Sequence, residues 1–293
     1  MTRRPTPATP FDDLWDYDEP VGTEAEFRSL RPKLEADGDR SVLLQLDTLI
    51  ARALSLQRNF GEAHLLLNSI EPELDSVDST VRVRWLLERG RTFNSAGKKE
   101  PAKKAFLEAW ELAQSIHAEF FAVDAAHMLA IVEEGAEALR WNEQALNYAR
   151  SSEDPRAKQW QGSLLNNLAW AHHEKGDFER ALTLFEEALA FRKKQGKEAE
   201  IDVAEWCVAR VLRSLGRENE ALARQQELLR RKEDARRAPD GFVFEELGEC
   251  LLALGREAEA GPWFAKAHKE LSQDPWLVEN EPERLERLEK LGR

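Results

Sequence analysis

The sequence of 293 residues contains little of the chemistry that disulfide-stabilised, zinc-binding or membrane-spanning proteins need. Its two cysteines, Cys207 and Cys250, are far apart and match neither a disulfide framework nor a zinc-binding pattern. No apolar run approaches the roughly 18 to 20 residues of a membrane-spanning helix. The N-terminal stretch has no apolar segment after its two arginines, so no secretory signal is visible. We therefore expect a soluble, cytoplasmic protein.

Positive charge is scarce as well. The chain has 42 Lys and Arg residues against 55 Asp and Glu residues, which gives a formal net charge of -13. Nucleic acids and anionic membranes attract positively charged surfaces, so this balance argues against both as partners. We expect no nucleic-acid binding and no insertion into a membrane.

Catalytic motifs are also missing. The sequence has no phosphate-binding G-x-x-x-x-G-K-[ST] loop, no G-x-G-x-x-G, no G-x-S-x-G elbow and no H-E-x-x-H. The adjacent His172 and His173 would point about 100° apart on a helix, which suits a shared metal poorly. Asp124 and His127 could share a helix face as an acid/base pair, although a plain surface contact is the commoner outcome. We expect no enzyme activity, no cofactor and no metal; a metal-dependent enzyme using Asp124, His127 and His173 is the weakest alternative.

What the sequence does contain is an internal repeat. In three places a small residue lies 12 residues before an alanine, which lies seven residues before another alanine, with a phenylalanine between the two. The copies are Gly90, Ala102, Phe106 and Ala109; Ala169, Ala181, Phe185 and Ala188; and Gly248, Ala260, Phe264 and Ala267. With the weaker copies included, the first alanines are Ala63, Ala102, Ala138, Ala181, Ala221 and Ala260, which are 39, 36, 43, 40 and 39 residues apart.

This pattern predicts helices packed in pairs. Apolar residues three and four apart line one stripe of each helix. Small residues let two backbones approach closely, while a phenylalanine fills the space beside them. Gly176, Gly216 and Gly255 stand where a helix end needs a positive φ. Since one pair buries only part of its apolar surface, the pairs must stack.

The repeat resembles the tetratricopeptide repeat (TPR), whose signature runs W-x2-L-G-x2-Y, then A-x3-F, then P. The resemblance covers about residues 42–272, and the period near 40 exceeds the usual 34 residues. The stretch from Ser163 to Leu189 is most similar to the long-period repeats of kinesin light chains and their bacterial relatives. The resemblance implies an all-α fold, a right-handed superhelical solenoid of about six TPR-like helix pairs with a C-terminal capping helix.

Three regions are expected. Residues 1–22 should form a disordered or extended segment rich in acidic and aromatic side chains, residues 23–272 the repeat domain, and residues 273–293 the capping helix. Thr23 is the expected N-cap of the first helix, which Pro32 interrupts, and the last helix is expected at about 281–291. The acidic and aromatic stretch 11–18 could fold back onto the repeats as an autoinhibitory segment.

In the resembled family, the first helix of each pair lines a concave groove that holds peptides or helices. The resemblance places the following candidate peptide-binding residues in that groove: Arg52, Arg84, Arg91, Asn94, His127, Asn166, Asn167, Trp170, His173, Trp206, Arg210 and Arg213. The acidic residues Glu88, Asp124, Glu245, Glu246 and Glu249 fall on the same faces.

Two interpretations of the groove arginines stay open. Guanidinium groups bind carboxylates through two hydrogen bonds, so the ligand could be an acidic segment or a C-terminal carboxylate. Alternatively, the arginines pair with neighbouring Glu and Asp side chains. The favoured function is a non-catalytic adaptor or scaffold that binds a protein or peptide; the alternative is a regulatory sensor that responds to a peptide.

Overall fold

The computed structural model describes residues 9–238 and 240–293, which are helices joined by turns without a β-strand. Residues 1–8, part of the segment expected to be disordered, lie outside this description. The helices are α1 (Pro20–Asp37), α2 (Arg40–Leu56), α3 (Phe60–Ile70), α4 (Ser79–Ser95), α5 (Lys99–Ser115), α6 (Glu119–Val132), α7 (Gly135–Ser151), α8 (Pro155–Gln159), α9 (Gln161–Glu174), α10 (Phe178–Gln195), α11 (Glu198–Ser214), α12 (Glu218–Asp234), α13 (Gly241–Ala253), α14 (Glu257–Leu271), α15 (Pro275–Asn280) and α16 (Pro282–Leu291), with a 3-10 turn at Glu71–Glu73.

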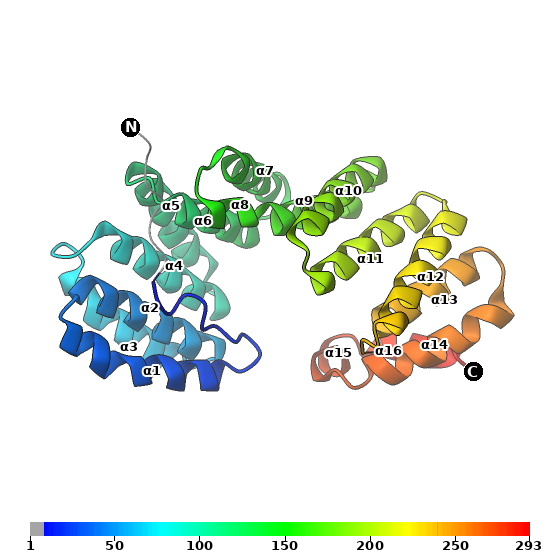
Figure 1. Ribbon diagram of the computed structural model, residues 1–293, viewed down its shortest axis with the longest axis horizontal. Helices are drawn as coiled ribbons and strands as arrows, with labels where there is room; N and C mark the ends of the chain where they lie inside the picture. The colour runs from blue at the N-terminus through cyan, green and yellow to red at the C-terminus, as the bar shows by residue number, and fades with distance from the viewer. Residues whose placement is uncertain (1–8, 239) are drawn as a thin grey trace. The chain divides into compact units, whose positions relative to one another are not determined.

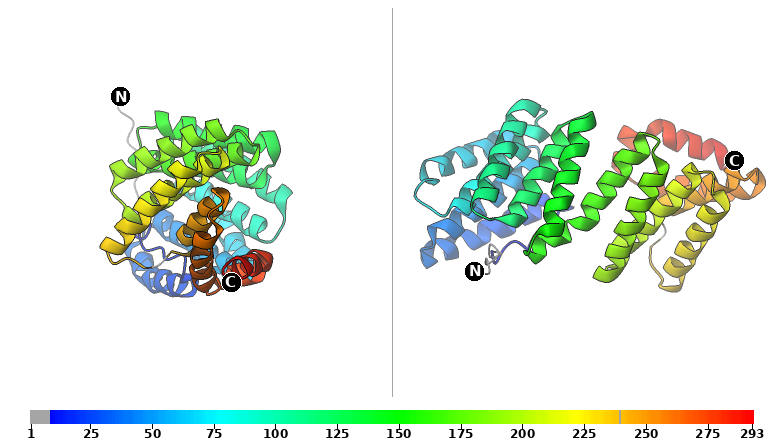
Figure 2. Two further views of the ribbon diagram at one scale, coloured as in Figure 1. Left: turned by 90° about the vertical axis from the view of Figure 1, so that its right-hand side faces the viewer. Right: turned by 90° about the horizontal axis from the view of Figure 1, so that it is seen from above.

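The chain divides into two compact units, one ending at Leu164 and the other starting at Leu165. In unit 1, α1 packs on α2, and the pairs α2/α3, α4/α5 and α6/α7 follow, with α2, α4 and α6 as first helices. In unit 2, the pairs α11/α12 and α13/α14 follow α10, and α16 packs on α14. Figures 1 and 2 show consecutive helices side by side within each unit. The predicted solenoid of TPR-like helix pairs is confirmed.

The packing of each pair follows the predicted small-residue rule. A Cβ atom added to Gly90 would lie 2.4 Å from the Phe106 ring, and one added to Gly248 would lie 2.8 Å from the Phe264 ring. Both rings are buried, with about 1% of their surface exposed or less. The glycines therefore create the space that the phenylalanines of the second helices fill.

The turns between paired helices also have the predicted geometry. Gly176 follows α9 with a φ of 78°, and Gly216 follows α11 with a φ of 71°. These angles lie in the left-handed region, which glycine adopts without steric cost. Glycine thus ends the first helix and lets the second begin within two residues.

The start of the first helix differs from the prediction. Helix α1 begins at Pro20 rather than after Thr23, because a proline in the first turn needs no hydrogen-bond partner for its missing N–H. The Thr23 hydroxyl instead donates to the carbonyl oxygen of Asp16 (2.9 Å) and accepts from its N–H (3.2 Å). Helix α1 also continues through Pro32 instead of ending there. Thr23 therefore fastens the preceding segment to α1.

Two short helices end the described chain. Helix α16 lies within the range predicted for the last helix. It packs on α14 of the same unit, and its Leu285 and Leu288 are buried. Just after it, a Cβ atom on Gly292 would lie 2.7 Å from the backbone nitrogen of Ala265 in α14. Among the residues that the structure describes, no helix is both long and apolar enough to cross a membrane.

Candidate peptide-binding faces

Unit 1 contains a cavity of about 280 Å³ on the side of its first helices. The cavity is lined by side chains of α2, α4 and α6, and by α8 with Trp160. The N-terminal segment, defined here as residues 9–19, precedes α1 (dark blue in Figure 1) and also contributes to the lining. A piece of the chain from outside the helices thus already lies on this face.

Two residues anchor the N-terminal segment. Phe11 is 1% exposed, and Asp12 accepts a hydrogen bond of 2.5 Å from Nη2 of Arg84 in α4. Arg84 is itself buried, and its guanidinium carbon lies 4.9 Å from the centre of the Phe121 ring. A second guanidinium, that of Arg156, lies 3.9 Å from the other Asp12 oxygen. The segment therefore buries an aromatic side chain and presents the adjacent carboxylate to two guanidinium groups.

Further along the segment, two aromatic rings cover α2. Trp15 and Tyr17 are stacked with their centres 5.2 Å apart, and Trp15 also meets Phe27 of α1 edge-on. The Arg52 guanidinium lies 5.6 Å from each of the stacked rings. A cation over an aromatic face is attracted to it, so Arg52 helps to hold both rings.

Arg52 and Arg91 are paired with carboxylates of the repeats themselves. Glu88 of α4 accepts from Arg52 of α2 (3.3 Å) and from Arg91 of its own helix (2.6 Å). Arg91 also donates to Asp124 of α6. Burial lowers the pKa of Arg91, but Asp124 and Glu88 raise it more, so the net shift is upward. This chain of ion pairs joins three consecutive first helices.

His127 of α6 lies against Trp160, with ring centres 5.1 Å apart, and its Nδ1 is buried without a hydrogen-bond partner among the described residues. Burial lowers its pKa below the ordinary value of 6.5; Asp124 opposes this shift and Arg91 adds to it. Asp124 is bound to Arg91, so the disfavoured alternative of an acid/base pair between Asp124 and His127 gains no support. His127 is held neutral.

This environment makes unit 1 sensitive to acid. Below pH 6.5 the unfolded chain protonates His127 before the folded chain does, so stability should fall as the pH drops toward the lowered pKa. Replacing His127 with glutamine should reduce this loss. Melting temperatures of both proteins between pH 7.5 and 5 would measure it, with His268→Gln as the control; equal pH profiles for wild type and His127→Gln would contradict the prediction.

In unit 2, aromatic side chains follow one another along the first helices. The ring centres of Trp170 in α9 and Trp206 in α11 are 6.1 Å apart, and that of Phe242 in α13 is 6.4 Å from Trp206. The indole N–H of Trp206 donates to the carbonyl oxygen of Phe242 (3.0 Å). Trp170 also packs edge-on against Phe185 of α10. This aromatic row is part of the unit 2 face, defined as the side of α9, α11 and α13 that carries the predicted residues.

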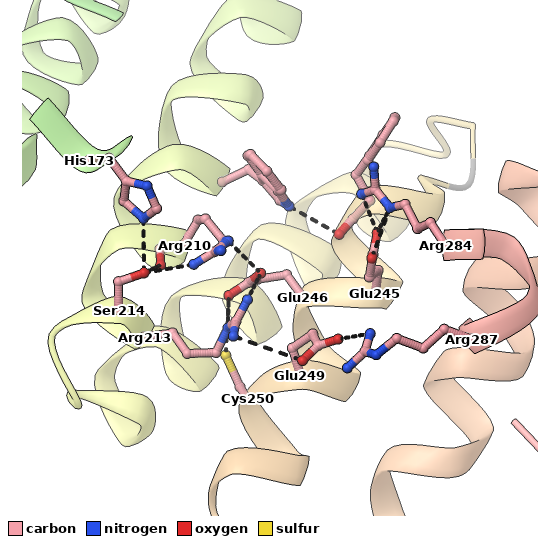
Figure 3. A network of polar contacts seen from close by, with 12 residues as sticks. His173, Arg210, Arg213, Ser214, Glu245, Glu246, Glu249, Cys250, Arg284 and Arg287 are labelled. Atoms are coloured by element: carbon pink, nitrogen blue, oxygen red, sulfur yellow. Dashed lines mark hydrogen bonds and ion pairs between the residues drawn. The ribbon is translucent and has the colours of Figure 1, made fainter. Parts of the chain in front are cut away.

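A network of arginines and glutamates lies beside the aromatic row (Figure 3). Glu246 of α13 is 2% exposed and accepts two hydrogen bonds from Arg213 of α11, at 2.6 and 3.0 Å. Arg210 lies 3.8 Å from the same carboxylate. Burial raises the pKa of Glu246, while Arg213 opposes that rise. One buried carboxylate therefore faces two guanidinium groups.

The outer members of the network link α13 to the end of the chain. Glu249 lies 3.8 Å from Arg213 and accepts a hydrogen bond from Arg287 of α16, while Glu245 accepts from Arg284 (2.5 Å). The acidic patch expected on α13 is thus neutralised by arginines of α11 and α16.

His173 completes the network at its other end. Its Nε2 lies 2.9 Å from the Ser214 hydroxyl, which also accepts from Arg210 (2.7 Å). Burial lowers the pKa of His173, and Arg210 lowers it further. The ring is therefore neutral and shares Ser214 with the arginine.

The amide side chains have different surroundings. Asn166 accepts a weak hydrogen bond from the Cys207 thiol (3.4 Å), whereas Asn167 has no side-chain hydrogen bond within the described parts of the chain. Asn94 lies near the end of α4 and is half-buried.

Burial raises the pKa of Cys207 and of Cys250 to about 12, so both thiols are protonated at neutral pH and poorly reactive.

The structure therefore separates the predicted residues into two groups. Unit 1 holds Arg52, Arg84, Arg91, Asn94 and His127, and unit 2 holds Asn166, Asn167, Trp170, His173, Trp206, Arg210 and Arg213. All five predicted arginines have a carboxylate within 4 Å, as the pairing interpretation requires. Nowhere in the described residues do three His, Cys, Asp or Glu side chains gather so as to hold a metal ion.

Sequence reasoning missed Arg156, Phe121 and the arginines of α16 as partners of these residues. Arg156 and Phe121 contact groups on the N-terminal segment or α4 that are far away along the chain. The α16 arginines could have been found from their spacing, since Arg284 and Arg287 are 39 and 38 residues after their partners, which is one repeat period.

Comparisons with known proteins identify the repeat and the fold. The family model described as tetratricopeptide repeat matches residues 121–194. No curated protein matches the chain by sequence. Among solved structures, the apo form of the quorum sensor NprR from B. thuringiensis is 14% identical to this chain, with a TM-score of 0.63. The match covers 93% of this chain and 78% of the NprR chain.

Two further structures share the fold. NprR in complex with its cognate peptide NprX is 14% identical with a TM-score of 0.52, over 94% of this chain and 81% of its own. The TPR-like repeats of a putative kinesin light chain from P. anserina are 18% identical with a TM-score of 0.55, over 66% of this chain and 95% of their own. Residues 121–194 thus match the tetratricopeptide repeat, and the chain shares the fold of kinesin-light-chain-like repeats.

Proposed function

We propose that this protein is a non-catalytic adaptor or regulator in the cytoplasm, and that the faces of its first helices bind a peptide or an extended segment of a partner protein. One observation carries the proposal: the N-terminal segment lines the unit 1 cavity together with side chains of α2, α4 and α6. The groups that face it, guanidinium, carboxylate and aromatic side chains, are those that hold peptides in protein complexes.

The unit 2 face supports the same function. It offers the row of Trp170, Trp206 and Phe242 beside Asn167, whose amide can both donate to and accept from a peptide backbone. Since Asn167 makes no side-chain hydrogen bond inside the described chain, binding a peptide there breaks no existing bond. The similar fold of NprR, which binds its cognate peptide NprX, favours a regulatory sensor as the second form of this function.

The test uses peptide display on the full chain. Peptides selected from a random library should bind wild type, and Asn167→Ala should weaken binding roughly fivefold, the equivalent of about one hydrogen bond. Asn147→Ala is the matched control, because Asn147 is an exposed asparagine on the second helix α7. Fluorescence polarisation gives the affinities; failure to select any peptide, or equal weakening by both substitutions, would contradict the proposal.

To distinguish an adaptor from a sensor, the bound and free proteins can be compared by small-angle scattering and tryptophan fluorescence. A sensor should change its scattering radius or its emission when the selected peptide binds, since Trp170 and Trp206 lie on the binding face. An adaptor should bind without such a change in radius.

A further inference from the structure

We infer that the unit 1 cavity is part of a receptor site for peptides in which an aromatic residue is followed by an acidic residue. Its internal occupant is the pair of Asp12, which lines the cavity, and the buried Phe11 that precedes it. This inference rests on the proposed function and adds the chemical class of the ligand. The contacts of Arg84, the burial of Phe11 and the pairing of the other arginines support it.

Arg84 is the residue of the cavity that needs a carboxylate from outside the repeats. It is 5% exposed, and within the described residues its carboxylate partner is Asp12, 72 positions away in the sequence. Its Nε is buried without a hydrogen-bond partner in the same residues. A buried guanidinium without an anion is costly, so whatever leaves or enters this site must exchange one carboxylate for another.

The neighbouring arginines do not have this need. The ion pairs of Arg52 with Glu88, and of Arg91 with Glu88 and Asp124, do not depend on the N-terminal segment. Their carboxylates belong to α4 and α6. Specificity for an acidic group is therefore concentrated at Arg84. This distinguishes Arg84 from the rest of the arginines that the sequence suggested.

The aromatic requirement comes from Phe11. Its ring is 1% exposed although it belongs to a segment outside the helices, and it directly precedes Asp12. Burial of a large apolar ring is strongly favourable, so Phe11 is a main anchor of the segment. A competing peptide must replace both the ring and the carboxylate to occupy the site equally well.

The segment has the features of an exchangeable occupant. Its local order consists of a turn at residues 10–13 and a hydrogen bond from the Asp18 N–H to the Asp16 carboxylate, and Tyr17 is 59% exposed. The Thr23 contacts to Asp16 tether it to α1, which keeps it near the cavity after release. A tethered occupant lowers the apparent affinity of a free peptide by the fraction of time that it fills the site.

The experiment measures whether a free peptide competes with the segment. The probe is a fluorescein-labelled peptide with the sequence of residues 9–18, TPFDDLWDYD, added to the full chain. The double variant Phe11→Ser, Asp12→Arg should release the segment, so the probe should bind it at least about tenfold more tightly than it binds wild type. The control Asp18→Arg makes the same change of charge at an exposed aspartate of the segment that does not line the cavity, and it should behave like wild type.

Two further arms test the role of Arg84. A probe with Asp12→Asn should bind the released variant roughly tenfold more weakly, the loss expected for a hydrogen bond between charged groups. Arg84→Gln in the released variant should remove the preference for the acidic probe. Circular dichroism checks folding, and Asp12→Asn in the full chain is a milder releasing variant that also should raise probe affinity if the double variant does not fold.

Equal probe affinity for wild type, the released variant and Asp18→Arg would overturn the inference. So would an Asp12→Asn probe that binds as well as the original. If the probe does not bind but library peptides bind in an Asn167-dependent manner, the inference is wrong and the proposed function stands. If neither kind of peptide binds, the proposed function fails as well.

Discussion

Replacing Glu246 with glutamine should lower the free energy of unfolding by about 3 kcal/mol, the scale expected when one partner of a buried ion pair is removed. Glu246 is 2% exposed and receives two hydrogen bonds from Arg213, while Arg210 lies close by. Without the carboxylate, two guanidinium groups would repel each other in a partly buried site. Denaturant unfolding followed by circular dichroism measures the effect.

The control for Glu246 is Glu259→Gln, which removes one partner of an exposed pair with Arg256. Exposed ion pairs contribute little, so this variant should unfold like wild type. The double variant Glu246→Leu, Arg213→Met should recover much of the lost stability, because it removes the stranded charge along with its partner. A Glu246→Gln variant as stable as wild type would show that the network does not stabilise unit 2.

Replacing Gly90 with alanine should destabilise the protein by about 1–3 kcal/mol, although alanine is the better helix former. The new Cβ atom would lie 2.4 Å from the Phe106 ring, which is fully buried and cannot move aside freely. The two helices of the pair would have to separate. Thermal and denaturant unfolding would both register this loss.

Gly61 provides the opposite case within the same protein. It lies near the start of α3, is exposed, and a Cβ atom there would meet nothing within 4 Å. Gly61→Ala should therefore leave stability unchanged or raise it by up to about 1 kcal/mol. If Gly90→Ala also stabilised the protein, the close approach of α4 and α5 would not be the reason for the glycine.

The sequence predicted the helix pairs well because their packing depends on neighbouring residues in a fixed pattern. A small residue 12 positions before an alanine is enough to identify each close contact, as Gly90 and Gly248 show. In the weak repeat that begins at Ala138, this alanine is half-buried, whereas Ala145, seven residues later, and Trp141, one place early for the usual aromatic, are buried. The pattern thus failed there only at its first position.

The candidate faces were harder to predict, because a residue's partner lies on another element. The sequence located the arginines on the first helices but not the carboxylate that each one binds. Arg84 illustrates the limit, since its partner Asp12 lies 72 positions away in a segment with no repeat pattern. The start of α1 was missed for a local reason, because Thr23 caps the N-terminal segment and not the helix.

The ion pairs between first helices have a direction. Arg52 of α2 binds Glu88 of α4, Arg91 of α4 binds Asp124 of α6, and Arg213 of α11 binds Glu246 of α13; within each unit the arginine belongs to the earlier repeat. Helix α4 thus meets α2 with a carboxylate and α6 with a guanidinium group. Because both junctions have the same polarity, loss of the α4/α5 pair would bring Arg52 toward Asp124, a group of opposite charge. The charges therefore fix the direction in which pairs stack, and they allow a pair to be duplicated or lost during evolution.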